Sequence, residues 1–283
     1  MGIAIGINAW VWTAPVGDNV VPLIKKAAKM GFDCFEIPIE DPAAFNADKI
    51  KAALEEAGIK AVTCGAFGPS RDLTSDDPKF RQESLDYIAA AVKLAEKWGS
   101  KVLAGPAYSA VGKRRQVSPA QKKKEWDLAV KGLKKAGKIA ADHGVTIAIE
   151  PLNRFETDLI NTAEQAIRLV KEVDSPGVGV HLDTFHMHIE EKCSYDAIRR
   201  AGKLLKHVHL CENDRGAPGS GQVHWDIVAK ALKEVKYGGA CVIESFTPEC
   251  KSIAAAAAIW RPLCKDQDTL AKEGLKHLRK ILG

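Results

Sequence analysis

The stretch TIAIE at residues 146–150 is a short apolar run that ends on a carboxylate, and three later stretches repeat its design. The four runs are TIAIE (146–150), VGVHLD (178–183), KHVH (206–209) and CVIE (241–244), which end at Glu150, Asp183, His209 and Glu244. Short apolar runs bounded by turn residues are typical of buried β-strands. The end residues are 33, 26 and 35 positions apart, close to the roughly 30 residues of one strand and helix repeat. The sequence therefore predicts parallel strands that carry metal-binding types of side chain to one edge.

Eight such apolar runs are spaced along the chain, and segments of helical period separate them. The runs lie near residues 3–8, 33–38, 59–65, 101–105, 145–150, 178–183, 206–211 and 240–245. Several helical segments are followed by glycine, as at Gly31, Gly58 and Gly144, where a helix end favours a left-handed residue. Eight strand and helix units with right-handed crossovers close naturally into an α/β structure of the (β/α)8 barrel type. We predict this fold for residues 1–283 as one domain, with an open doubly wound sheet as the less favoured alternative.

The composition favours an ordinary globular protein over one that binds nucleic acid or membrane. The chain is 46% hydrophobic and 27% charged, and its formal net charge is only +5. Its one tight basic cluster, at residues 113–115, is interpreted as a surface loop, because a nucleic-acid partner needs a broader basic stripe. No run is long enough to span a bilayer, and the seven cysteines form no C-x-x-C pair. We therefore expect a cytoplasmic protein.

Three carboxylates and one imidazole at one edge are suited to a divalent cation. The carboxyl ends of barrel strands face the same side, so the four strand-end residues should converge although the sequence separates them widely. Oxygen ligands with a single histidine suit Mn²⁺, Mg²⁺ or Co²⁺, whereas a structural zinc site favours thiolates. A lone acid at a strand end is often only a helix N-cap, but four residues that follow one rule are harder to explain in this way. We expect one catalytic divalent cation per subunit.

The loops after these strands bring further polar side chains to the same rim. Glu156 follows the first of them, His186 the second and Arg215 the third. Such a rim suits a polyhydroxylated ligand, because each sugar hydroxyl removed from water needs a replacement partner. His181 and His207 share strand faces with two of the predicted ligands, and we expect them beneath the cation as supporting residues.

Longer segments around these positions carry a family resemblance. They are IEPLNRFET (149–157), HLDTFHMHIEE (181–191), HVHLCENDRGAPGSGQVHW (207–225) and VIESF (242–246). Together they strongly resemble the ketose 3-epimerases of the D-tagatose/D-psicose (allulose) type, within the xylose isomerase-like TIM barrel superfamily. The similarity extends over nearly the whole chain.

The resemblance implies roles for individual residues. The metal ligands it implies are Glu150, Asp183, His209 and Glu244, and the substrate contacts are Glu156, His186 and Arg215. It also places Cys64, at the end of the third strand, and Phe246 in the lining of the sugar pocket, with weaker indications for Trp12 and Tyr108. The family further implies Mn²⁺ as the first choice of cation and a homodimer or homotetramer as the assembly.

The activity that the resemblance implies is C3 epimerisation of a free ketose of the D-tagatose, D-allulose/D-fructose or L-ribulose type through a cis-enediolate. A cation on the C2 and C3 oxygens would acidify the C3 proton, and Glu150 and Glu244 would remove it from one face and return it on the other.

The residues themselves leave other functions open. An aldose-ketose isomerase of the hydroxypyruvate isomerase type uses the same groups. An abasic-site endonuclease needs further His and Glu ligands, which residues 63–65 and 104–106 do not supply. A barrel that only binds a sugar is disfavoured because both glutamates are present.

Overall fold

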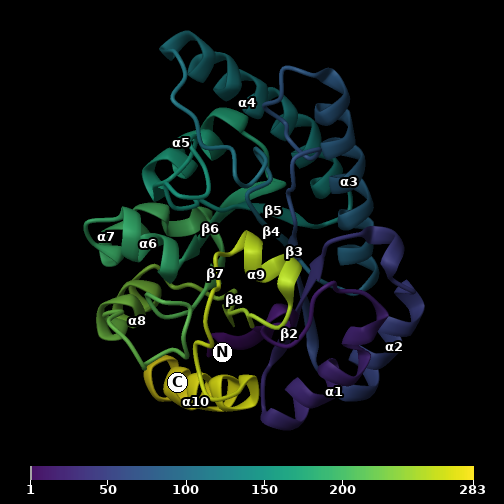
Figure 1. Cartoon of the computed structure of the whole chain (residues 1–283), viewed down its shortest axis with the longest axis vertical. Coiled ribbons are helices and arrows are strands. Elements are labelled where there is room, and N and C mark those ends of the chain that lie inside the picture. The colour runs from purple at the N-terminus through teal and green to yellow at the C-terminus, as the bar shows by residue number, and fades with distance from the viewer. Residues whose placement is uncertain (1) are drawn as a thin grey trace.

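The computed structural model describes residues 2–283, and its centre is a closed barrel of eight parallel strands (Figure 1). The strands follow the chain order around the barrel, and β8 closes it by pairing with β1. They are β1 (Ala4–Asn8), β2 (Cys34–Ile39), β3 (Lys60–Gly65), β4 (Val102–Gly105), β5 (Thr146–Ile149), β6 (Val178–Asp183), β7 (Leu205–His209) and β8 (Ala240–Ile243). The predicted (β/α)8 barrel is confirmed, and each strand falls on one of the eight predicted runs.

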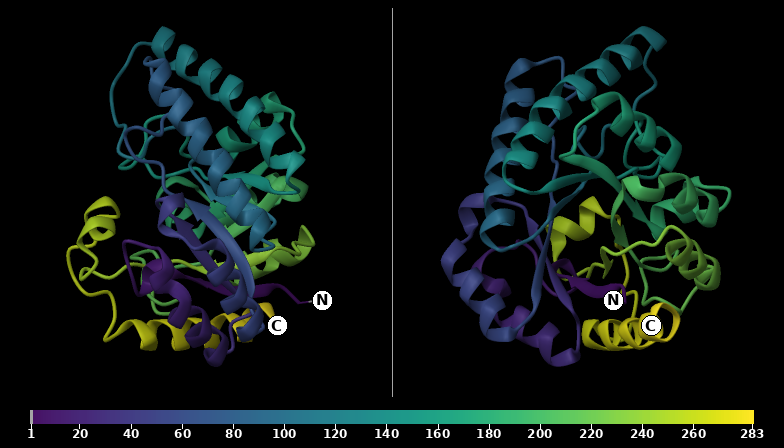
Figure 2. Two further views of the ribbon diagram at one scale, coloured as in Figure 1. Left: turned by 90° about the vertical axis from the view of Figure 1, so that its right-hand side faces the viewer. Right: turned by 180° about the vertical axis from the view of Figure 1, so that it is seen from behind.

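Most of the helices surround the barrel on its outside, whereas α9 (Lys251–Ala256) lies over the centre of the barrel in the view of Figure 1 (Figures 1 and 2). The helices are α1 (Val21–Met30), α2 (Ala47–Ala57), α3 (Pro78–Lys97), α4 (Pro119–Asp142), α5 (Ala163–Val173), α6 (Thr184–Glu190), α7 (Ser194–Ala201), α8 (Trp225–Glu234), α9 (Lys251–Ala256) and α10 (Gln267–Leu282). Short 3-10 turns lie at η1 (Ala9–Val11), η2 (Asp18–Val20), η3 (Pro42–Ala44) and η4 (Gly202–Leu204). The helix α10 runs past β1, so the two ends of the chain lie close together (Figure 2).

Local sequence signals explain where the helices begin and end. The first turn of α5 has a capping box, in which Thr162 and Gln165 satisfy each other's backbone amides. The helices α1 and α2 end at Gly31 and Gly58, which adopt the left-handed conformation with φ of 93° and 65°. These signals define the repeat and leave the strand ends free to present side chains.

A register shift between β6 and β7 places two strand ends side by side. Val180 pairs with Leu205, but His181 pairs with His207, so Lys206 is an extra residue in β7. A Cβ atom at Gly179 would lie 2.3 Å from Cγ of Lys206, so only glycine leaves room for this bulge. Beyond the bulge, Asp183 pairs with His209.

The described residues contain no helix that is both long and apolar enough to cross a membrane.

Candidate active site

The four strand-end residues predicted as metal ligands converge at the mouth of the barrel. Asp183 and His209 end β6 and β7, while Glu150 and Glu244 directly follow β5 and β8. Potential ligand atoms of Glu150, Asp183 and His209 all lie within 4.8 Å of one another. Glu244 reaches the same group, since its Oε1 lies 3.4 Å from Nδ1 of His209. All four side chains are buried.

Asp183 combines two roles that sequence reasoning treated as alternatives. Its Oδ1 accepts a hydrogen bond from the backbone N–H of Phe185 at 2.7 Å and so caps α6. Its Oδ2 contacts Nη1 of Arg215 at 2.5 Å. Burial opposes ionisation of the carboxyl, but the Arg215 guanidinium lowers the pKa of Asp183 to about 2. The aspartate is therefore an anion that faces the cluster.

The charge balance of this cluster fits a bound cation. Burial raises the pKa of the Glu150 carboxyl well above its usual range, and the nearby carboxylates of Glu244 and Asp183 raise it further, although His209 and Arg215 act in the opposite direction. Arg215 contacts Glu244 Oε2 at 2.7 Å as well as Asp183, and the His209 ring lies 3.4 Å from the other oxygen of Glu244. Buried carboxylates need paired positive charge, and a divalent ion beside three oxygen donors and one imidazole would supply it.

Arg215 is held rigidly over the cluster. Its backbone adopts the left-handed region with φ of 67°, and Oγ of Ser245 donates a hydrogen bond to its carbonyl oxygen at 2.6 Å. The guanidinium carbon lies 4.1 Å from the ring centroid of Phe185 and 5.3 Å from that of Phe246. The predicted pocket residue Phe246 therefore packs against the predicted substrate contact Arg215.

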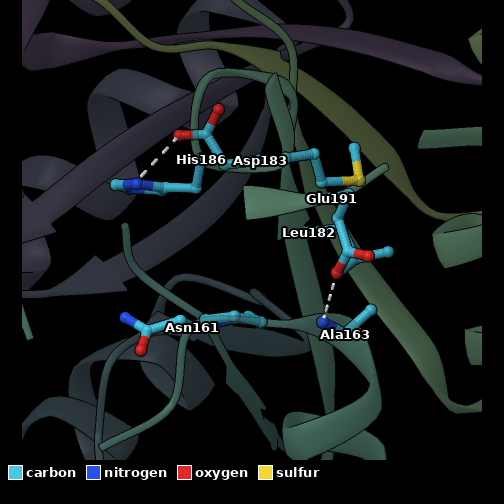
Figure 3. Close-up of a pocket in the computed structure, with 8 residues that line it drawn as sticks. Asn161, Ala163, Leu182, Asp183, His186 and Glu191 are labelled. Atoms are coloured by element: carbon cyan, nitrogen blue, oxygen red, sulfur yellow. Dashed lines mark hydrogen bonds and ion pairs between the residues drawn. The ribbon is translucent and has the colours of Figure 1, made fainter. Parts of the chain in front are cut away.

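His186 lies beside the carboxylates in a defined protonation form. The backbone N–H of Asn153 donates to Nδ1 of His186 at 3.1 Å, so a neutral imidazole carries its proton on Nε2. That Nε2 lies 3.7 Å from Glu150 Oε1 and 3.8 Å from Asp183 Oδ2. Figure 3 shows the His186 ring and the Asp183 carboxylate pointing toward each other. His186 thus presents an N–H donor to the cluster.

Asn153 links two predicted substrate contacts, although sequence reasoning assigned it no role. Its backbone holds His186, and its Nδ2 donates to Oε1 of Glu156 at 2.8 Å. On the outer side of this region, Glu191 accepts a hydrogen bond from the backbone N–H of Ala163 at 2.7 Å (Figure 3). That bond ties the end of α6 to the start of α5.

The remaining predicted pocket residues differ in their surroundings. Cys64 is buried at the end of β3, with its Sγ 3.5 Å from Nδ2 of Asn8. Trp12 donates through Nε1 to Asp268 at 2.8 Å, and the hydroxyl of the buried Tyr108 donates to the carbonyl of Ile160 at 3.2 Å. The polar atoms of these two aromatic side chains are therefore bonded to the scaffold.

A buried carboxylate beneath the cluster was missed by sequence reasoning. Glu36 in β2 is fully buried, with Oε2 at 2.8 Å from Nε2 of His209 and Oε1 at 2.8 Å from Nε2 of His207. Burial opposes its ionisation, but the two imidazoles lower the pKa of Glu36 well below its usual range. The only sequence signal was an acid within the apolar run CFEIPI (34–39).

His181 and His207, predicted as supporting residues, lie with His209 in the barrel interior. The ring centroids of His181 and His209 are 4.3 Å apart, and those of His207 and His209 are 4.9 Å apart. Both supporting side chains are fully buried.

Comparisons with known proteins agree with this geometry. A family model described as xylose isomerase-like TIM barrel matches residues 24–281. A ketose 3-epimerase of Arthrobacter globiformis is 31% identical over 284 residues, which cover 98% of this chain and 96% of the relative. A D-psicose 3-epimerase of Ruminiclostridium cellulolyticum is 36% identical over 251 residues, which cover 87% of this chain and 84% of the relative.

Solved structures extend the likeness to three dimensions. The D-allulose 3-epimerase from Methylomonas sp. in complex with D-allulose has a TM-score of 0.93 at 29% identity and covers 99% of this chain and 97% of its own. An AP endonuclease of family 2 from Brucella melitensis, at 23% identity and a TM-score of 0.72, shares the fold alone. The resemblance inferred from the four sequence segments is confirmed.

Proposed function

We propose that this chain, which belongs to the xylose isomerase-like TIM barrel family and to the ketose 3-epimerases within it, epimerises free ketoses at C3. The candidate substrates are D-tagatose, D-allulose with D-fructose, and L-ribulose. The observation that carries the proposal is the convergence of Glu150 and Glu244, from β5 and β8, on one buried group with Asp183 and His209. The names of relatives that match almost the full length of the chain support the same reaction.

The residues proposed to hold a divalent cation are Glu150, Asp183, His209 and Glu244. Three carboxylates and one imidazole suit Mn²⁺, which we propose as the first choice, and also Mg²⁺ or Co²⁺. When bound, the ion supplies Lewis-acid stabilisation of negative charge that develops on the substrate oxygens.

The proton at C3 is proposed to pass between two glutamates. Inversion requires removal of the proton from one face of the sugar and its return on the opposite face, so it needs an acid/base group on each side. Glu150 and Glu244 come from strands separated by β6 and β7, and each extends toward the cluster at the mouth. Arg215 holds the Glu244 carboxylate through its 2.7 Å contact.

Three further side chains are proposed to bind the sugar. His186 directs its Nε2–H toward the cluster, where it can donate to a substrate oxygen. The Nη2 of Arg215 lies 3.3 Å from Nε2 of His186. Both groups are donors in the neutral form of His186, so they do not bond to each other and both can donate to a substrate oxygen. Glu156, held by Asn153, can accept a hydrogen bond from a hydroxyl.

Deuterium incorporation tests the proposed reaction. The protein loaded with Mg²⁺ is incubated in D₂O with D-fructose, D-allulose, D-tagatose and L-ribulose separately, and products are followed by NMR. We expect label at C3 together with the C3 epimer. Label at C1 or C2 with an aldose product would instead assign an aldose-ketose isomerase, and an absence of exchange with every sugar would refute both.

A homodimer or homotetramer is the proposed assembly. Trp260 follows α9 and is 77% exposed, which is unusual for so large an aromatic side chain and typical of a surface that a second subunit covers. Light scattering with size-exclusion chromatography measures the mass directly, and a 30.6 kDa particle would refute this part of the proposal.

A further inference from the structure

We propose that Glu36 is a positioning residue that orients His209 so that Nδ1 of the imidazole faces the cation. The inference rests on the proposed metal-dependent function and adds a residue to it. Glu36 belongs to β2, on the side of the barrel that supplies none of the four proposed ligands. Its carboxylate acts through His209 and does not itself reach the substrate side of the cluster.

The two ring nitrogens of His209 have different surroundings. Nε2 lies 2.8 Å from Oε2 of Glu36, and an ionised carboxylate can only accept a hydrogen bond, so Nε2 carries the proton. Nδ1 lies 3.4 Å from Oε1 of Glu244 and has no hydrogen-bond partner among residues 2–283. In the neutral ring that binds a metal, the lone pair is therefore on the nitrogen that faces the other proposed ligands.

Glu36 is itself fixed from several directions. Nδ2 of Asn8 donates to Oε2 at 2.6 Å, and Nε2 of His207 lies 2.8 Å from Oε1. Asn8 in turn accepts a hydrogen bond from the backbone N–H of Trp10 at 2.8 Å and caps the turn η1. Because Oε2 is bonded to Asn8 and Oε1 lies against His207 in the buried interior, the carboxylate has little freedom to rotate, and residues of β1 and β2 set the orientation of the His209 ring.

A second metal ion is the alternative explanation of this network. Ligand atoms of His181, His207 and His209 also lie within 4.8 Å of one another. A tetrahedral ion with bonds of about 2.1 Å separates its ligand atoms by roughly 3.4 Å. The contact of Glu36 Oε2 with Nε2 of His209 is a hydrogen bond of 2.8 Å, shorter than that separation, whereas Oε1 of Glu36 lies 2.8 Å from Nε2 of His207 without hydrogen-bond geometry. A direct hydrogen bond is therefore the better account of the contact between Glu36 and His209.

Metal affinity of Glu36 variants tests the proposal. Glu36→Gln keeps an acceptor oxygen for Nε2–H but removes the charge, and Glu36→Leu removes both. Loss of such a supporting partner typically weakens metal binding about 10- to 100-fold. By calorimetry with Co²⁺ we expect a loss of about 10-fold for the Gln variant and about 100-fold for the Leu variant. Glu125→Gln, at a buried glutamate of α4 bonded to Arg115, is the matched control and should bind as the wild type does.

Proton NMR of the Co²⁺-loaded protein gives a readout that a general loss of packing would not produce. The cobalt ion shifts the signal of the Nε2–H proton of a histidine bound through Nδ1, and the bond to Glu36 protects that proton from exchange with water. We expect one such exchangeable signal in the wild type and in Glu125→Gln. In Glu36→Leu it should be lost or exchange much faster.

The outcomes separate this inference from the proposed function. If the wild type fails to bind Co²⁺, the metal-dependent function is refuted before any variant is considered. If the wild type binds but both Glu36 variants bind within about twofold of it with the same shifted signal, the role of Glu36 is refuted and the metal site stands. Should Glu36→Leu not fold, the decision rests on the isosteric Gln variant and on Asn8→Ala, which frees Glu36 on one side and should weaken binding several-fold.

Discussion

The two halves of the barrel contribute different kinds of residue to the candidate site. The four residues that converge at the mouth lie at the ends of β5 to β8 or directly after them. The strands β1 to β4 supply instead Asn8, Glu36 and Cys64, which lie buried and bond to one another or to His209. The second half thus carries the groups proposed to bind the cation, and the first half supplies Glu36 and Asn8, which support His209, together with the predicted pocket residue Cys64. A closed barrel makes this division possible because interior side chains of opposite strands meet.

The largest effects should come from the glutamates of the second half. Either Glu150→Gln or Glu244→Gln should lower turnover by about a thousandfold, because a positioned acid or base typically contributes 100- to 10,000-fold. Steady-state epimerisation of D-allulose measures the effect. Because both residues are also proposed ligands, bound metal must be quantified in the same samples. Near-normal turnover of a metal-loaded Glu244→Gln variant would rule out the scheme with two carboxylates.

Arg215→Lys sharpens the comparison within the second half. Arginine contacts Asp183 and Glu244 with one nitrogen and still has a free edge toward His186, a geometry that lysine cannot reproduce. Hydrogen bonds to charged groups are worth about 1.5–3 kcal/mol, so kcat/KM should fall about 10- to 100-fold. Unchanged kcat/KM would show that charge alone suffices at this position.

Asn153→Ala tests the support of a substrate contact. The variant loses the 2.8 Å bond to Glu156 and the 3.0 Å side-chain contact with Nδ1 of His186 but keeps the backbone bond to His186. A neutral hydrogen bond is worth about 1 kcal/mol, so we expect KM for the sugar to rise roughly fivefold with little change in kcat. A drop in kcat with constant KM would place Glu156 in the chemistry rather than in binding.

Cys64→Ser probes the first half with a minimal change. The hydroxyl can still accept from Asn8, which lies 3.5 Å from the sulfur. We expect kcat and metal affinity within about threefold of the wild type, because the new hydroxyl has nearly the size of the thiol and keeps the hydrogen bond with Asn8. A loss as large as that of Glu244→Gln would contradict the division between the two halves.

The smallest effect concerns stability in acid. Asp158 bonds to Lys122 at 2.6 Å and to Arg115 Nε at 3.1 Å, and although burial opposes its ionisation these partners lower its pKa. A carboxyl with a depressed folded-state pKa stabilises the protein above its unfolded pKa, near 3.8, and loses this effect as the pH falls through the folded value. Asp158→Asn should therefore lower the free energy of unfolding by about 1 kcal/mol at pH 7, with a difference that shrinks below pH 4. Urea unfolding at several pH values measures it, and a constant difference would contradict the ion pair.

The sequence was sufficient for the barrel and for the convergence of the second half. Strand ends repeat at a regular spacing, and parallel strands bring such ends together whatever the loops do. The strands of the first half show no such repeat of metal-binding residues at their ends. Glu36 lies inside a strand, and its partner His209 is 173 positions away in the sequence. Asn153 was equally hidden, since its role depends on a backbone amide that no residue pattern reveals. Contacts between distant strands require the closed geometry of the barrel.

The bulge at Lys206 limits how this scaffold can change in length. If the register that pairs Val180 with Leu205 continued without a bulge, Asp183 would pair with Val208, and His209 would face the other side of the sheet. A side chain at position 179 would clash with Lys206, so glycine is required there as long as the bulge is kept. Surface loops can be lengthened or shortened during evolution or engineering. An insertion or deletion in β6 or β7 would instead change which residues of the two strands lie opposite each other, and with them the positions of Asp183 and His209.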